Sequence, residues 1–144
     1  MATAVASTTN CKVVGIADGD TLTCLTDANL QVTVRLAEID APEKKQPFGQ
    51  RSRQALSDLC FGKPATLQVQ SIDRYRRTVA RVICAGTDAN ATQVRRGMAW
   101  VYNRYARDPA LYDLQREARE RRIGLWADAD PVPPWEWRKQ KRAK

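Results

Sequence analysis

Hydrophobic and polar residues alternate along the first third of the chain. Residues 11–17 and 21–26 flank an Asp-Gly-Asp turn, which is a strong hairpin signal. In the next run, 30–36, the side chains of Val32, Val34 and Leu36 face one way and those of Thr33 and Arg35 the other. The pattern predicts a three-stranded meander whose polar face carries Arg35.

The middle of the chain changes period. A Pro-containing loop over 40–48 precedes a helix over 49–61, where apolar residues recur at helical spacing and Gly62 follows the last turn. Alternation returns at 64–71 and 78–84, and predicts two more strands.

The last third predicts helices. One fits 88–96, and another begins at Asp108, which can cap it, and Pro109, which suits a first turn. Residues 131–144 open Pro-rich and close basic, so we expect an extended segment and then a frayed tail.

This order of elements predicts an α+β fold, a five-stranded OB-type β-barrel with three α-helices. A sheet packed openly against helices is the alternative. We expect a disordered N-terminal remnant over 1–10, one domain over 11–138 and a basic tail over 139–144. A length of 144 residues suits a single domain.

Composition narrows the function. The net charge of +8 and the pI near 9.7 suggest a polyanionic partner such as nucleic acid, although basic residues also simply keep small domains soluble. The chain has no histidine, which excludes Ser-His-Asp catalysis and His-ligated zinc. No apolar run approaches the roughly 20 residues that span a bilayer, so we expect no membrane segment.

The four cysteines are Cys11, Cys24, Cys60 and Cys84. Their spacing is too wide for a zinc site, and an even number fits two disulfides in a secreted or periplasmic protein, with four reduced thiols as the alternative. The pattern is compatible with Cys11–Cys24 and Cys60–Cys84, but three connectivities are possible. The start of the chain is not an intact signal peptide, although it fits the remnant of one.

Acidic residues gather at the ends of the predicted strands. A meander can bring Asp18 and Asp20 to the same end as Asp40 and Glu43. Because like charges repel, we expect a cation among them, and an all-oxygen ligand set suits Ca2+ or Mg2+. Taken alone, the Asp-Gly-Asp segment at 18–20 is typical of a tight turn, and residues 40–43 are typical of the start of a loop.

Two arginines add to this set. Arg35 and Arg77 could hold the oxygens of a phosphodiester and stabilise the charge that develops during attack. A lone strand arginine is more often a solvated or salt-bridged residue, so the hypothesis depends on the whole group.

Six motifs resemble the staphylococcal nuclease (thermonuclease) family, in order over residues 11–138. They are "DGDT" at 18–21, "VRLAEIDAPE" at 34–43, "DRYRRTVA" at 73–80, "RRGMAWVY" at 95–102, "GLW" at 124–126 and "PPWEWR" at 133–138. The resemblance implies an OB barrel with three helices and a Ca2+-dependent endonuclease that hydrolyses DNA and RNA to 3′-phosphate ends.

The resemblance also implies roles for individual residues. Asp20, Asp40 and the backbone carbonyl of Ala41 match the ligands of one Ca2+ ion. Glu43 matches the residue that activates the attacking water. The further matches are Arg35 and Arg77 to the phosphate-binding arginines, Arg74, Tyr75 and Tyr105 to the substrate pocket, and Asp18 to an acid beside the metal.

Two positions depart from the family pattern. Ala41 stands where the best-known member has Thr, and Arg76 replaces the usual Gly of a turn, which puts strain on that turn if its φ is positive. Glu38 has no assigned partner, and we expect it at the surface or beside the site. We expect a monomer. The alternative functions are a non-catalytic nucleic-acid-binding module and a basic scaffold.

Overall fold

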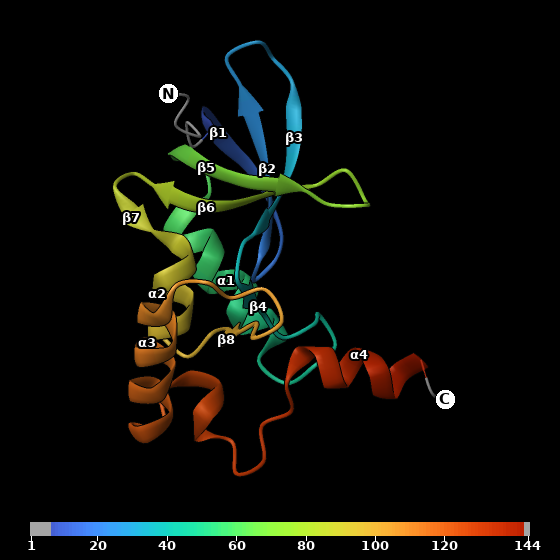
Figure 1. Ribbon diagram of the computed structural model, residues 1–144, viewed down its shortest axis with the longest axis vertical. Coiled ribbons are helices and arrows are strands. Elements are labelled where there is room, and N and C mark those ends of the chain that lie inside the picture. The colour runs from blue at the N-terminus through green and yellow to red at the C-terminus, as the bar shows by residue number, and fades with distance from the viewer. Residues whose placement is uncertain (1–6, 143–144) are drawn as a thin grey trace, which may run out of the picture.

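A closed five-stranded barrel forms the centre of the computed structural model, which describes residues 7–142 (Figure 1). Its strands are β1 (Ser7–Asp18), β2 (Thr21–Thr26), β3 (Gln31–Leu36), β5 (Pro64–Ile72) and β6 (Thr78–Cys84). Antiparallel pairs join β3, β2, β1, β5 and β6 in that order, and a parallel pair between β3 and β6 closes the ring. The predicted α+β class and the five-stranded OB-type barrel are confirmed.

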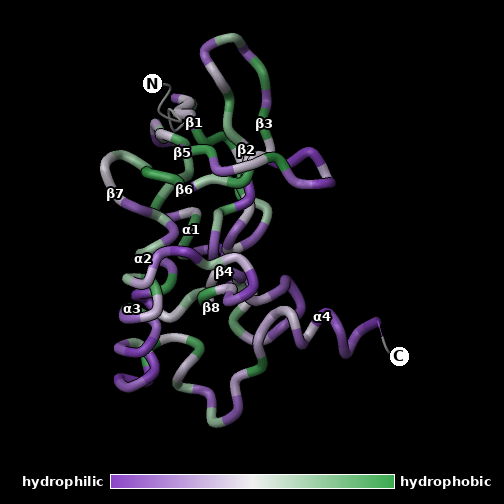
Figure 2. The backbone as a smooth tube through the Cα atoms, in the orientation of Figure 1, coloured by the Kyte–Doolittle hydropathy of each residue, from purple (hydrophilic) through white to green (hydrophobic). Residues whose placement is uncertain are grey.

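The alternating positions form the barrel core. Val34 and Leu36 of β3 are fully buried, as are Leu22 of β2 and Val82 of β6. Figure 2 shows the strands as mixed in hydropathy, whereas the β5–β6 turn, α3 and α4 are mostly hydrophilic. The period-two pattern therefore placed the core side of the strands correctly.

The structure has four α-helices rather than the three expected. They are α1 (Gly49–Cys60), α2 (Ala89–Arg95), α3 (Pro109–Glu120) and α4 (Pro134–Arg142). A short 3-10 helix, η1 (Gly124–Ala127), follows α3. The first three α-helices gather at one end of the barrel, and α4 projects sideways (Figure 1).

The helix α4 corrects the expectation of an extended segment and a frayed basic tail. Residues 139–142 belong to this helix, while 143–144 lie outside the described part. Pro134 suits the start of a helix, and basic residues in the last turn complement the helix dipole. The helix also docks through Trp135, which stacks on Tyr102 with ring centroids 5.4 Å apart. That contact joins distant parts of the chain, so local composition did not reveal it.

The N-terminal boundary is also corrected in part. Residues 7–10, expected in a disordered remnant, form the start of β1 and pair with residues 66–69 of β5. Residues 1–6 lie outside the described part.

Three short strands were not expected. β4 (Ile39–Asp40) pairs with β8 (Trp100–Val101), and β7 (Thr87–Asp88) pairs with the end of β6. In the first pair Asp40 lies opposite Trp100, which fixes the backbone of this acidic residue. Two-residue strands are too short for a periodicity to predict them.

Two disulfides connect parts of this fold. Cys11–Cys24 joins β1 to β2, and Cys60–Cys84 joins the end of α1 to the end of β6. Of the three possible connectivities, the structure has the pairing named above. Across residues 7–142, no helix is long and apolar enough to cross a membrane.

Candidate active site

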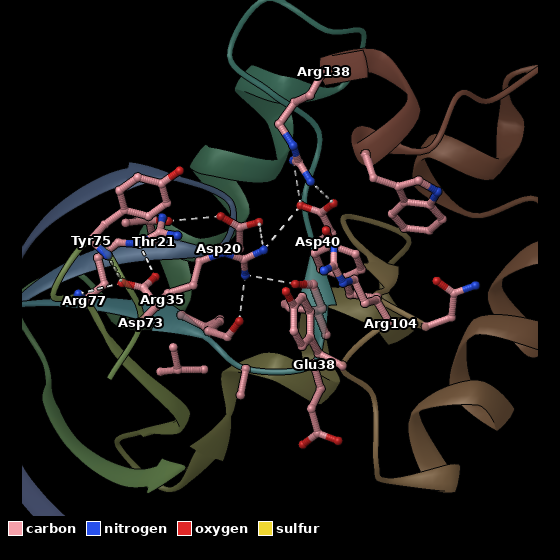
Figure 3. Close-up of a pocket in the computed structure, with 18 of the residues that line it drawn as sticks. Asp20, Thr21, Arg35, Glu38, Asp40, Asp73, Tyr75, Arg77, Arg104 and Arg138 are labelled. Carbon is pink, nitrogen blue, oxygen red and sulfur yellow. Dashed lines mark hydrogen bonds and ion pairs between the residues drawn. The ribbon is translucent and has the colours of Figure 1, made fainter. Parts of the chain in front are cut away.

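A cleft of about 1020 Å³ opens where the barrel meets β4, the loop after β8 and α4. Acidic, basic and aromatic side chains line it together (Figure 3). The lining residues include Asp18, Asp20, Arg35, Glu38, Asp40, Glu43, Arg74, Tyr75, Arg77, Tyr102, Tyr105, Trp135 and Arg138. Every side chain that the sequence singled out for the site lines this cleft, apart from Ala41, whose backbone lies beside it.

The β1–β2 turn positions Asp20. One carboxylate oxygen, Oδ2, accepts the backbone N–H of Ala41 at 2.7 Å, and the other accepts the Thr21 hydroxyl at 3.1 Å. The preceding residue must be glycine, because a Cβ atom on Gly19 would lie 1.7 Å from the Ser52 Oγ. The turn therefore packs closely against α1. This close packing places Asp20 beside Ala41, at the start of the loop after β4.

Arg35 binds the two aspartates together. Its Nη1 donates to the carbonyls of Leu36 at 2.7 Å and Ile39 at 2.9 Å, which fixes the guanidinium. Its Nη2 then lies 3.4 Å from Asp20 Oδ2 and 3.3 Å from Asp40 Oδ1. The convergence expected from the meander is present, with Arg35 at the meeting point.

Arg138 of α4 makes the closest contacts to Asp40 and Glu43. Its Nη2 donates to Asp40 Oδ2 at 2.7 Å, and its Nη1 donates to Asp40 Oδ1 at 3.0 Å and Glu43 Oε1 at 2.8 Å. Figure 3 shows Arg138 reaching from α4 to Asp40. From the sequence, Arg138 was expected only as one of the basic C-terminal residues, with no role in the site. The motif "PPWEWR" was the available signal.

Burial and the charges of neighbouring residues give the carboxylates of the site different pKa values. Burial, followed by the charge of Asp20, raises the pKa of Asp18 to about 7. Burial also raises the pKa of Asp40 to about 6, although hydrogen bonds from Arg138 oppose the rise. Burial alone would raise the pKa of Asp20, but the Arg35 charge and three hydrogen bonds outweigh it and lower that pKa. Asp20 therefore stays ionised near neutral pH, whereas Asp18 is partly protonated.

The chemistry of the donor set fits a hard divalent cation. Asp20 and Asp40 converge on one nitrogen of Arg35, so a positive charge already stands between them. All the nearby side-chain ligands are oxygens, as Ca2+ prefers. Within residues 7–142, however, no three acidic, cysteine or histidine side chains are gathered as a metal site. Arg35 and Arg138 instead both donate hydrogen bonds to Asp40.

The structure does not bring Arg77 to the acidic group. Its Nε donates to Asp73 Oδ2 at 2.8 Å, and its guanidinium lies 5.4 Å from the Tyr75 ring centroid. Arg74 donates to the Tyr75 hydroxyl at 2.8 Å. All of these residues line the cleft. Figure 3 shows Asp73, Tyr75 and Arg77 beside the barrel strands. The departure at Arg76 has a visible consequence, since its φ of 64° lies in the left-handed region.

Another part of the cleft lining is aromatic. Tyr105 is 56% exposed and packs edge-on against Tyr102, which stacks on Trp135. Tyr105 was singled out from the sequence, whereas Tyr102 and Trp135 were not. Both belong to motifs quoted above, but their stacking depends on α4 docking beside the loop after β8.

Glu38, for which the sequence indicated no partner, lies beside the site rather than at the surface. It is buried, and its Oε1 accepts the backbone N–H groups of Arg107 at 2.6 Å and Asp108 at 2.8 Å. Its Oε2 accepts from Gln70 at 3.0 Å and lies 3.6 Å from Arg81. The pKa of Glu38 is lowered because these hydrogen bonds and the Arg81 charge outweigh burial. Glu38 therefore ties the segment before Asp40 to the loop that carries Tyr105.

Comparisons with known proteins agree with this arrangement. The family model described as "Staphylococcal nuclease homologue" matches residues 33–128. An "Uncharacterized endonuclease" of Haemophilus influenzae is 50% identical over 132 residues, which cover 92% of this chain and 74% of the relative. A protein of the same name from Escherichia coli O157:H7 is 47% identical over 131 residues, covering 90% of this chain and 85% of the relative.

A third relative has a more specific name. The "Micrococcal nuclease" of Shigella flexneri is 42% identical over 139 residues, which cover 89% of this chain and 79% of the relative. The family match, these identities and the closed barrel with its acidic and basic cleft lead to one assignment. The chain belongs to the staphylococcal nuclease homologue family.

Proposed function

We propose that the protein is a Ca2+-dependent endonuclease that hydrolyses phosphodiester bonds of DNA and RNA and leaves 3′-phosphate ends. The observation that carries this proposal is the meeting of Asp20 and Asp40 at one Arg35 nitrogen, in a cleft that basic and aromatic side chains also line. Membership of a nuclease family and relatives named endonucleases support the same substrate class.

Asp20 and Asp40 would hold the ion, together with the backbone carbonyl of Ala41. Bound Ca2+ supplies a charge that polarises the phosphate and a place for the attacking water. Asp18 lies next to Asp20, whose N–H donates to Asp18 Oδ1 at 3.2 Å, and would orient it.

The other residues act on the substrate. Glu43 would accept the proton of the attacking water, and Arg35 would bind a phosphate oxygen and stabilise the charge that develops in the transition state. Arg77 would make the second phosphate contact, since a charged guanidinium can form two parallel hydrogen bonds to a phosphate. Arg74, Tyr75 and Tyr105 would line the path of the nucleotide.

The test compares wild type with Glu43→Gln on single-stranded DNA, duplex DNA and RNA. We expect cleavage in Ca2+, none in EDTA, and a fall of at least about a hundredfold in the variant, which is typical for loss of an acid–base group. Glu117→Gln is the matched control, because Glu117 is an exposed residue of α3 outside the cleft. The 3′ ends of the products are then tested for a phosphate by phosphatase treatment and enzymatic extension.

Two outcomes would contradict the mechanism: cleavage that survives EDTA, and an undiminished Glu43→Gln variant. Retardation of nucleic acid in gels without cleavage would favour the non-catalytic binding module instead.

We also propose that the protein is exported to the periplasm or the cell exterior and acts as a monomer. The two disulfides support an oxidising compartment. Mass spectrometry after alkylation, with and without reductant, should find no alkylated thiol before reduction in protein from its native compartment. Four alkylated cysteines would contradict export, and a dimeric mass in light scattering would contradict the monomer.

A further inference from the structure

Arg138 donates hydrogen bonds to two acidic residues in the cleft, Asp40 and Glu43. Both oxygens of Asp40 and one oxygen of Glu43 accept hydrogen bonds from its guanidinium, at 2.7, 3.0 and 2.8 Å. The Asp40 side chain is only 1% exposed, so it has little water to exchange for another partner. A two-bonded, fork-like contact of this kind is the strongest pairing that arginine makes with a carboxylate.

The helix that carries Arg138 is held by its first turn. Pro134 is buried, Trp135 stacks on Tyr102, and the Trp135 ring lies 5.5 Å from that of Trp100. Just before the helix, Gln46 Nε2 donates to the Val132 carbonyl at 2.6 Å. Residues three apart share a helix face, so the docking of Trp135 aims Arg138 into the cleft.

Among the described residues, the second half of α4 has no comparable hydrogen bond or ring contact to the rest of the protein. Residues 139–142 are exposed, and helices of this length are marginal without packing. Among the ion pairs of residues 7–142, those of Arg138 with Asp40 and Glu43 are therefore the last that attach α4 to the body of the protein.

These contacts conflict with the proposed role of Asp40. A divalent cation bound to the same oxygens would stand beside the guanidinium, and two positive charges at that distance repel. We propose that Arg138 is an exchangeable counter-ion of the metal site: it holds Asp40 and Glu43 in the metal-free protein and leaves them when Ca2+ binds. This inference rests on the proposed function, because it takes Asp40 as a Ca2+ ligand.

Two consequences follow from the exchange. Because displacement of Arg138 from the carboxylates costs free energy, the apparent affinity of the protein for Ca2+ is lower than it would be without Arg138. Ca2+ binding is also coupled to the attachment of α4, and the coupling is reciprocal: whatever loosens α4 tightens Ca2+ binding.

Calorimetric titration of Ca2+ tests the first consequence without any substrate. Arg138→Gln should bind Ca2+ about tenfold more tightly than wild type at low ionic strength and pH 8.5, where the carboxylates of the site are ionised. Lys141→Gln is the matched control, since it removes the same charge from the same helix at an exposed position outside the cleft. Its affinity should stay within about twofold of wild type. Equal or weaker Ca2+ binding by Arg138→Gln, relative to this control, overturns the inference.

Hydrogen exchange of the wild-type protein tests the second consequence and needs no folded variant. Addition of Ca2+ should speed amide exchange over residues 136–142 and leave the barrel strands unchanged. Unchanged or slower exchange in this segment overturns the inference.

The outcomes separate this inference from the proposed function. Ca2+-dependent cleavage and Ca2+ binding by wild type, with no tighter binding by Arg138→Gln, overturn only the role of Arg138. Absence of Ca2+ binding by both wild type and Arg138→Gln overturns both proposals. Binding by Arg138→Gln alone supports the displacement in its strongest form.

Discussion

Glu38 and Arg76 both have backbone angles that favour glycine, with φ of 69° and 64°. For most side chains this conformation costs about 1–2 kcal/mol. Glu38 offsets the strain through its three hydrogen bonds to Arg107, Asp108 and Gln70. Arg76 is exposed, and its position is held only by a backbone bond from its N–H to the Asp73 carbonyl at 3.0 Å. The two residues therefore lead to opposite expectations.

Substitution of Glu38 should loosen the loop that carries Tyr105. Glu38→Ala removes the acceptor of two backbone N–H groups, and hydrogen bonds to a charged group contribute about 1.5–3 kcal/mol. We expect the free energy of unfolding to fall by about 2 kcal/mol and amide exchange to quicken over residues 103–108. Chemical denaturation and hydrogen exchange measure both. Glu120→Ala, at an exposed position of α3, is the control. If Glu38→Ala lowers the free energy of unfolding no more than this control does, the hydrogen bonds of Glu38 do not stabilise the loop.

Substitution of Arg76 should stabilise the protein. Arg76→Gly relieves the left-handed strain but adds freedom to the unfolded chain, so the net gain is about 0.5–1 kcal/mol. Arg76→Ala keeps the strained angle and should gain nothing. Thermal unfolding of the two variants separates the backbone effect from the loss of the side chain, and an equal gain in both would refute the strain argument.

At the scale of elements, the helix α3 shows how a local signal and a tertiary contact act through one residue. Asp108 caps α3 by accepting the N–H of Ala110 at 3.0 Å, as expected from its place before Pro109. It also accepts a hydrogen bond from Arg81 of β6 at 3.0 Å. The Arg81 bond, followed by the cap, lowers the pKa of Asp108 below its usual value. One carboxylate thus begins a helix and ties it to the barrel.

Removal of this cap should cost stability in a pH-dependent way. Because the folded-state pKa of Asp108 is depressed, its contribution is present above the ordinary value of 3.8 and is lost as the pH falls through the folded value. We expect Asp108→Ala to lower the free energy of unfolding by about 1 kcal/mol at pH 7. The difference from wild type should shrink by pH 3. Urea denaturation at both pH values tests this, and a constant difference would mean that the charge of Asp108 is unimportant.

At the scale of the whole molecule, the barrel is closed by contacts between distant segments and then reinforced covalently. The parallel pairing of β3 with β6 joins Val34 to Thr78 and Leu36 to Ala80. The Cys60–Cys84 disulfide joins α1 to the end of β6 across 24 residues, whereas Cys11–Cys24 spans 13 residues within one hairpin. The larger loop restricts the unfolded chain more.

The two disulfides should therefore differ in their effect on stability. Loop closure gives about 3.5 kcal/mol for Cys60–Cys84 and about 3 kcal/mol for Cys11–Cys24. We expect Cys60→Ala/Cys84→Ala to lower the denaturation midpoint more than Cys11→Ala/Cys24→Ala does. Guanidinium denaturation of both double variants measures the order, and a reversed order would point to native-state contacts rather than loop entropy.

Local patterns in the sequence determined much of this fold. The alternation of Val34 and Leu36 with Arg35, the Asp-Gly turn at 18–20 and the cap at Asp108 each depend on near neighbours in the chain, so they predicted strands, a hairpin and a helix start. The same motifs predicted several acids and arginines that line the cleft, among them Asp20, Asp40 and Arg35, but not Arg138. Five barrel strands and three of four helices were predicted in this way.

Only the tertiary structure decided how the charged groups pair. Arg138 meets Asp40 and Glu43 across 98 and 95 residues of chain, Glu38 is buried by a loop about 70 residues away, and Arg77 binds Asp73 rather than the acidic group. The disulfide pairing and the helix α4 likewise depend on which surfaces pack together. Periodicity and capping are properties of neighbouring residues, whereas ion pairing and docking depend on burial and distance in space, which no local pattern contains.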